Sequence, residues 1–88
     1  MAVPERTANQ MSLPDGAIAS LVREMRQARD THGPYATAHE LYAVLLEEVD
    51  EFWDSVKTDT PDAYELLQVA AVAFRGYIQL TEGPGYEV

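Results

Sequence analysis

The segment from Leu66 to Leu80 constrains the fold of this chain most, because nearly all of it is apolar. A helix that is apolar around most of its circumference needs neighbours on several sides. The segment is interrupted only by Gln68, Arg75, Gly76 and Gln79. Upstream, Thr60-Pro61-Asp62 offers an N-cap, a proline at the first helical position and a first-turn acid. Downstream, Gly83-Pro84-Gly85 is a stop signal, so we predict a largely buried helix that ends at about Leu80.

A second, amphipathic helix is predicted from Thr37 to about Lys57. Thr37 and Glu40 are spaced as a capping box, in which Thr37 accepts from the backbone N–H of Glu40 and Glu40 reaches back to the cap. At about 100° per residue, one arc of this helix is apolar and contains Leu41, Tyr42, Leu45, Leu46, Val49, Phe52, Trp53 and Val56. The opposite arc is acidic and contains Glu40, Glu47, Asp50, Glu51 and Asp54, with Glu48 at the boundary. A short turn near Asp59 predicts an antiparallel hairpin with the helix that follows.

The earliest helix along the chain is predicted from Pro14 or Asp15 to Asp30. Its buried stripe is expected to contain Ile18, Leu21, Val22 and Met25. The chain then divides into a flexible tail over residues 1–12, one helical domain over residues 13–81 and a C-terminal tail over residues 82–88. We expect an all-α fold with three main helices. Because a chain of 88 residues buries only roughly 60% of its unfolded surface, we also expect a homo-oligomer, a dimer or tetramer, that completes a helical bundle.

The net charge of −9 disfavours nucleic-acid backbones and anionic membranes as direct partners, because both would be repelled. The chain has no cysteine, which excludes disulfides, thiolate metal sites and cysteine nucleophiles. No stretch approaches the roughly 20 apolar residues of a membrane span, and the first residues lack the apolar run of a secretory signal. We therefore expect a cytoplasmic protein whose ligands are cations, basic partners or metal-bridged polyphosphates.

The acidic residues of the hairpin form the candidate site. Glu47 and Glu51 lie one turn apart on the predicted helix, and Glu48 flanks Glu51. Gln68 lies at the depth of Glu51 in the hairpin, and Glu65 lies about one turn nearer the connection, so both are expected to converge on these carboxylates. Oxygen ligands in this number suit a hard cation such as Mg²⁺ or Mn²⁺. We predict a metal site formed by Glu47, Glu48, Glu51, Glu65 and Gln68.

Two short motifs carry a family resemblance. Glu47-Glu48-Val49-Asp50-Glu51 is similar to the E-E-x-x-E signature of the MazG-like, all-α nucleoside triphosphate pyrophosphohydrolases. Glu65-Leu66-Leu67-Gln68 falls where that family has an E-x-x-D motif on the next helix, and the stretch from Gly33 to Trp53 resembles short bacterial and phage proteins near the superfamily. The resemblance spans residues 18–80. It implies Mg²⁺-dependent hydrolysis of a nucleoside triphosphate to the monophosphate and pyrophosphate, with Glu48 as the candidate catalytic base.

Plainer interpretations stay open for the same residues. The acidic arc is also what a solvated helix face would carry. Gln68 replaces the family's aspartate, which predicts weaker metal binding, and it could instead satisfy a backbone group in a packed interface. Arg75 is expected to pair with Glu40 or Glu47 rather than with a phosphate. The alternative function is a non-catalytic helical module that oligomerises or binds a partner protein, and a third is an acidic decoy for a basic protein.

Overall fold

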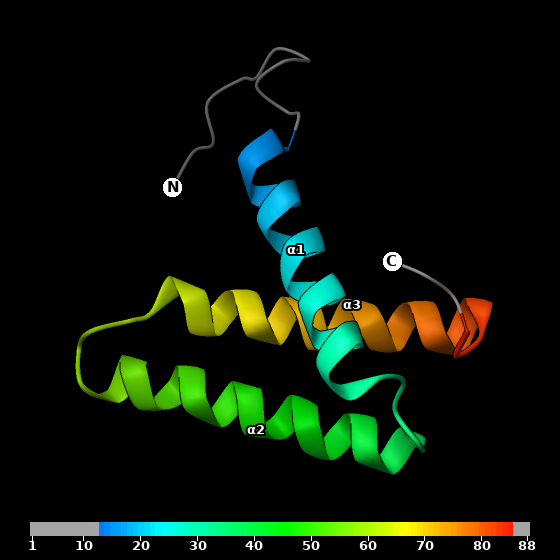
Figure 1. The fold of residues 1–88 in the computed structure, drawn as a ribbon. Coiled ribbons are helices and arrows are strands. Elements are labelled where there is room, and N and C mark those ends of the chain that lie inside the picture. Colours follow the sequence, from blue (N-terminus) through cyan, green and yellow to red (C-terminus); the bar gives the residue numbers. More distant parts are fainter. Residues whose placement is uncertain (1–12, 86–88) are drawn as a thin grey trace, which may run out of the picture.

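The computed structural model describes residues 13–85, which form three α-helices and no strand (Figure 1). These helices are α1 (Asp15–His32), α2 (Ala38–Lys57) and α3 (Ala63–Glu82). The all-α prediction is therefore confirmed over the described residues, and α2 and α3 form the expected antiparallel hairpin. The predicted N-terminal tail and the last three residues of the predicted C-terminal tail lie outside the described part of the chain. No helix among residues 13–85 is long and apolar enough to cross a membrane.

The helix boundaries follow local capping, with three shifts from the sequence prediction. α3 continues to Glu82, two residues beyond Leu80 and one residue into the predicted C-terminal tail. α1 continues to His32, two residues beyond Asp30, and ends at Gly33, whose φ of 70° is accessible to glycine. α3 begins later than expected. Its N-cap is Asp62, whose carboxylate accepts from the Tyr64 backbone N–H at 2.9 Å. Thr60 belongs instead to the turn, because its backbone N–H donates to the Ser55 carbonyl at 3.1 Å.

The capping box of α2 is formed with one change. Thr37 Oγ1 accepts from the Glu40 backbone N–H at 3.1 Å, as predicted. The Glu40 carboxylate accepts from the backbone N–H of Ala36 at 3.3 Å rather than from that of the cap residue. The first contact satisfies a backbone donor that a helix start leaves without a partner, and the second ties the residue before the cap to the first turn.

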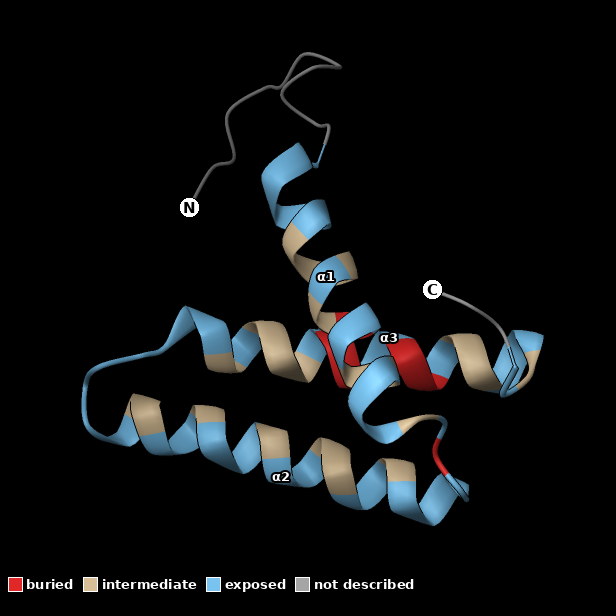
Figure 2. Ribbon diagram, in the orientation of Figure 1, coloured by how far each residue is buried: buried red, intermediate tan, exposed pale blue. Residues whose placement is uncertain are grey.

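The third helix is the centre of the fold, because it packs against both α2 and α1. α2 runs beside α3, and α1 crosses α3 steeply and extends away from the hairpin (Figure 1). The buried side chains gather where α1 meets α3 and at the connection to α2 (Figure 2). They are Met25, Tyr35, Ala71, Val72 and Arg75. At Gly76 the two hairpin helices approach so closely that an added Cβ would lie 2.6 Å from Leu41 Cδ2.

The predicted apolar arc of α2 is only partly covered. Leu41, Leu45, Phe52 and Val56 are half-buried on the side of α3. The other four members of the arc are exposed, namely Tyr42, Leu46, Val49 and Trp53. The reason is geometric, since α1 lies across the opposite side of the hairpin. Ile18 is also 42% exposed, because the first half of α1 projects beyond α3.

Candidate metal site and adjoining cavity

Three carboxylates from the two hairpin helices meet at one place. Glu48 and Glu51 come from α2 and Glu65 comes from α3. One carboxylate oxygen of each residue lies within 4.8 Å of the others. Glu48 and Glu51 are three residues apart and therefore neighbours on one helix face, and the short turn brings the first turn of α3 level with them. We call these residues the acidic triad.

Glu48 has the most perturbed environment of the triad. Its Oε2 atom is buried and has no hydrogen-bond partner among the described residues. Burial, together with the neighbouring Glu51 and Glu65 carboxylates, raises the pKa of this carboxyl to about 7. Desolvation and the adjacent Glu51 also raise the pKa of Glu65. A bound proton or a bound cation would reduce the repulsion among these crowded carboxylates.

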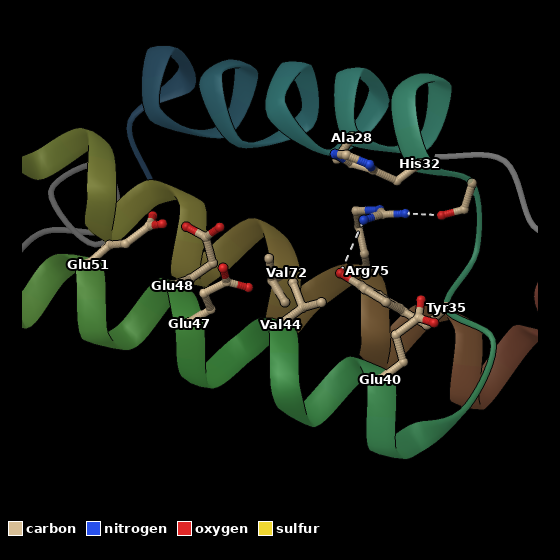
Figure 3. Close-up of a pocket in the computed structure, with 11 residues that line it drawn as sticks. Ala28, His32, Tyr35, Glu40, Val44, Glu47, Glu48, Glu51, Val72 and Arg75 are labelled. Atoms are coloured by element: carbon tan, nitrogen blue, oxygen red, sulfur yellow. Dashed lines mark hydrogen bonds between the residues drawn. The ribbon is translucent and has the colours of Figure 1, made fainter.

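A cavity of about 340 Å³ extends from the acidic triad towards the connection between α1 and α2 (Figure 3). At one end it is lined by Glu47, Glu48 and Glu51. Its middle is apolar, with Val44 and Val72, and Ala28 lies beside His32. At the other end lie His32, Gly33, Tyr35, Glu40 and Arg75. The cavity therefore joins an acidic end to an end that holds a guanidinium group, and its size is near the lower limit of small-molecule pockets.

The Arg75 guanidinium is directed to the connection between α1 and α2. It donates to the Gly33 carbonyl at 2.6 Å and to the Tyr35 hydroxyl at 3.1 Å, and it stacks over the Tyr35 ring at 4.8 Å (Figure 3). The expected ion pair with Glu40 or Glu47 is not formed, because these bonds hold the side chain at the connection. Gln79 strengthens the same contact, since its amide exchanges two hydrogen bonds with the Tyr35 backbone, at 2.9 and 2.8 Å.

Gln68 makes its strong contact with α1. Its Nε2 donates to Glu24 Oε2 at 2.6 Å, and the Tyr64 hydroxyl donates to the same oxygen at 3.3 Å. One side of α3 carries the residues that we call the α3 polar stripe, namely Glu65, Gln68, Val72, Arg75 and Gln79. This stripe divides, with Glu65 among the hairpin carboxylates and Gln68 towards α1. A ligand role for the Gln68 oxygen stays a prediction, as does the catalytic role of Glu48. Glu47 lines the cavity but is not a member of the acidic triad.

Sequence reasoning missed the contribution of α1 to this site. Three residues of α1, spaced four positions apart, contribute to it. Glu24 accepts a hydrogen bond from Gln68 of α3, and Ala28 and His32 line the cavity. The signal was available, because Glu24 is the only acidic residue between Asp15 and Asp30 in a helix otherwise rich in arginine. What the pattern could not give was the crossing of α1 over α3.

Comparison with family models, with curated protein sequences and with solved structures gave no match. The resemblance to MazG-like pyrophosphohydrolases therefore depends on the two short motifs and on their spacing in this chain. The structure contains an acidic triad that could bind a metal ion, next to a cavity of small-molecule size.

Proposed function

We propose that the chain binds a divalent cation at the acidic triad and uses it to hydrolyse a nucleoside triphosphate to the monophosphate and pyrophosphate. The main support for this proposal is the convergence of three carboxylates from two helices, one of them with a buried oxygen that has no hydrogen-bond partner within residues 13–85. The MazG-like motifs supply the reaction class. The cavity beside the triad offers room for part of a nucleotide.

The triad fits Mg²⁺ or Mn²⁺ in chemistry and approximately in size. Both ions prefer oxygen ligands, and Mg²⁺ binds them at about 2.1 Å, so two oxygens bound to one ion lie at most about 4.2 Å apart. The triad oxygens lie within 4.8 Å of one another, so they would have to move slightly closer together to hold one ion. Three carboxylates in one place also favour a cation over a neutral ligand.

Each protein group then has a definite part in the proposed reaction. Glu48, Glu51 and Glu65 would hold the ion. The ion would supply charge neutralisation on the phosphate oxygens and would acidify the attacking water. Water attacks the α-phosphorus, the bond to the bridging oxygen breaks, and pyrophosphate leaves. Glu48 accepts the water proton.

A metal-dependent shift in thermal unfolding tests the binding step. Mg²⁺ or Mn²⁺ at a hundred times its Kd is expected to raise the free energy of unfolding by about 2.7 kcal/mol. Glu51→Gln should abolish the shift because it removes a triad carboxylate. Asp50→Asn is the matched control, since it removes one charge from an exposed position of the same helix and should keep the shift. Equal shifts in the two variants would place the ion elsewhere.

The reaction is tested separately, by pyrophosphate release from a nucleotide panel with Mg²⁺ or Mn²⁺. Release that requires both the metal and Glu48 is the expected result. A metal-dependent shift without pyrophosphate release from any nucleotide would leave a metal-binding protein and remove the hydrolase. If the metal causes no shift and no nucleotide releases pyrophosphate, the chain is better explained as a non-catalytic helical module, the second candidate.

The second candidate is a non-catalytic helical module that oligomerises or binds a protein. It is supported by the exposed large apolar side chains of α2 and α3 and by the contact of Gln68 with Glu24, which uses an amide at the position of the family's aspartate.

A further inference from the structure

Two rows of exposed apolar side chains run along the hairpin. On α2 the row is Tyr42, Leu46, Val49 and Trp53, and on α3 it is Leu66, Ala70, Ala73 and Tyr77. Both rows follow the i, i+4, i+7, i+11 spacing of a single helix face. We call the two rows together the apolar hairpin face.

Both rows point away from the cavity. Each member of the α2 row follows a cavity-lining residue by two positions, as Leu46 follows Val44. Each member of the α3 row precedes a residue of the α3 polar stripe by two positions, as Ala70 precedes Val72. Two positions correspond to about 200° around a helix. Since the polar stripe meets α1 and its connection to α2, the apolar hairpin face lies on the opposite side of the hairpin.

The two rows are also in register, so that the face is continuous. Measured from the turn between Asp59 and Thr60, equal depths pair Trp53 with Leu66, Val49 with Ala70, Leu46 with Ala73, and Tyr42 with Tyr77. No member of the face is charged, although the chain has a net charge of −9. The large side chains predominate on α2, and the centre of the α3 row consists of the two alanines.

The exposed area is of the size that a stable interface needs. The six large members are between 42% and 64% exposed. If a large side chain presents roughly 200 Å² when fully accessible, they leave on the order of 600 Å² of apolar surface. That area is at the upper end of the patches found on monomers. It approaches the about 800 Å² that each partner contributes to a standard interface, before any polar rim is counted.

We propose that a second copy of this chain covers the apolar hairpin face and forms a symmetric dimer around a four-helix bundle. A rotation about an axis parallel to the helices places α2 of each copy over α3 of the other, with Leu46 and Val49 above the small Ala73 and Ala70. A basic partner would find no carboxylate on this face to pair with. A second copy brings the same uncharged surface and keeps its acidic triad on the outer side, so the site is complete in one chain.

The oligomeric state of the full chain tests this interface, measured by sedimentation over a range of concentrations. The wild type is expected to be a dimer. Leu46→Glu should weaken it at least about 100-fold, because two charges would be buried at the centre. Ile18→Glu is the matched control, since Ile18 is 42% exposed on α1 and Leu46 is 44% exposed. A monomeric wild type, or an undiminished Leu46→Glu dimer, would overturn the proposal.

Cross-linking gives a second test that does not depend on a disruptive variant. The chain has no cysteine, so Leu46→Cys and Ala73→Cys each introduce a single thiol. Mixed under mild oxidation, the two variants should form a disulfide with each other faster than either does with itself, because Leu46 of one copy faces Ala73 of the other. Absence of the mixed product would exclude this arrangement. The thermal shift with Mn²⁺ should persist in the Leu46→Glu monomer, which separates this proposal from the metal site.

Discussion

Substitution of Glu48 by glutamine should show how much the crowded carboxylate lowers the stability of the metal-free protein, separately from its part in binding metal. Glu48 has a pKa of about 7 in the folded chain against an ordinary value of 4.5. The folded state therefore holds this proton more tightly than the unfolded state does. Stability from this group is present below about pH 4.5 and is lost as the pH rises through about 7. Glutamine resembles the protonated acid at every pH, so Glu48→Gln should stabilise the metal-free protein increasingly as the pH rises.

The size of the expected change in the free energy of unfolding follows from the raised pKa of Glu48. A difference of about 2.5 pKa units corresponds to about 3 kcal/mol at 1.36 kcal/mol per unit. Glu48 is only partly buried, so solvent screening reduces this value. We expect the free-energy gap between Glu48→Gln and wild type to widen by about 1–3 kcal/mol between about pH 4 and pH 8.

Urea unfolding in the presence of a chelator measures this gap. Asp50→Asn, on the same helix but exposed, gives the effect of removing one charge from the acidic surface. With metal restored at high pH, the order should reverse, because wild type gains the ligand-dependent stability and Glu48→Gln loses a ligand. A gap that stays constant over the pH range would refute the argument that Glu48 is held against ionisation by its surroundings.

Two further predictions concern the contacts that position the hairpin. Gly76→Ala should lower the free energy of unfolding by about 1 kcal/mol in urea titrations, because overpacking against Leu41 exceeds the gain in helix propensity. The same substitution should become stabilising in a Leu41→Ala background, and the same sign in both backgrounds would contradict this explanation. Thr37→Ala should cost about 1 kcal/mol through loss of the bond from the Glu40 N–H. Thr37→Ser retains that acceptor and should stay near wild type.

The helices and the hairpin could be predicted because their signals are local. Apolar periodicity, the Thr37 capping box and the glycines after α1 and α3 act within a few residues of the structures they determine. The start of α3 was misplaced for the same reason. The sequence allows the N-cap of α3 at either Thr60 or Asp62. The hydrogen bonds that the backbone N–H groups of these two residues donate to Ser55 place Thr60 in the turn and the N-cap at Asp62.

The burial of the α2 apolar arc could not be predicted, because a stripe shows which side chains require cover and not which element supplies it. Leu41 and Leu45 are half-buried beside α3, whereas Tyr42 and Trp53 are exposed. Deciding between these sets requires the position of α1, and that position depends on contacts between residues about 40 positions apart. The bond from Arg75 to Gly33 is one of them.

The acidic triad was largely predictable, since helix spacing and a short turn fix the relative depth of Glu48, Glu51 and Glu65. Depth does not determine in which direction a side chain turns, however. Gln68 and Arg75 were expected to face the acidic arc, and both donate their bonds to α1 or to its connection. The position of α1 thus decides which polar residues of α3 remain near the triad.

Gln68 and Glu24 account for each other in this arrangement. The Gln68 amide donates to Glu24 at 2.6 Å, and the Tyr64 hydroxyl supports the same carboxylate. An aspartate at position 68, as in the MazG-like motif, would set a second carboxylate against Glu24, and like charges at that distance disfavour ionisation of both. Glutamine converts the repulsion into a hydrogen bond, while Glu24 brings a negative charge to the same side of α3. The amide at position 68, where the MazG-like motif has an aspartate, is therefore paired with a carboxylate from α1.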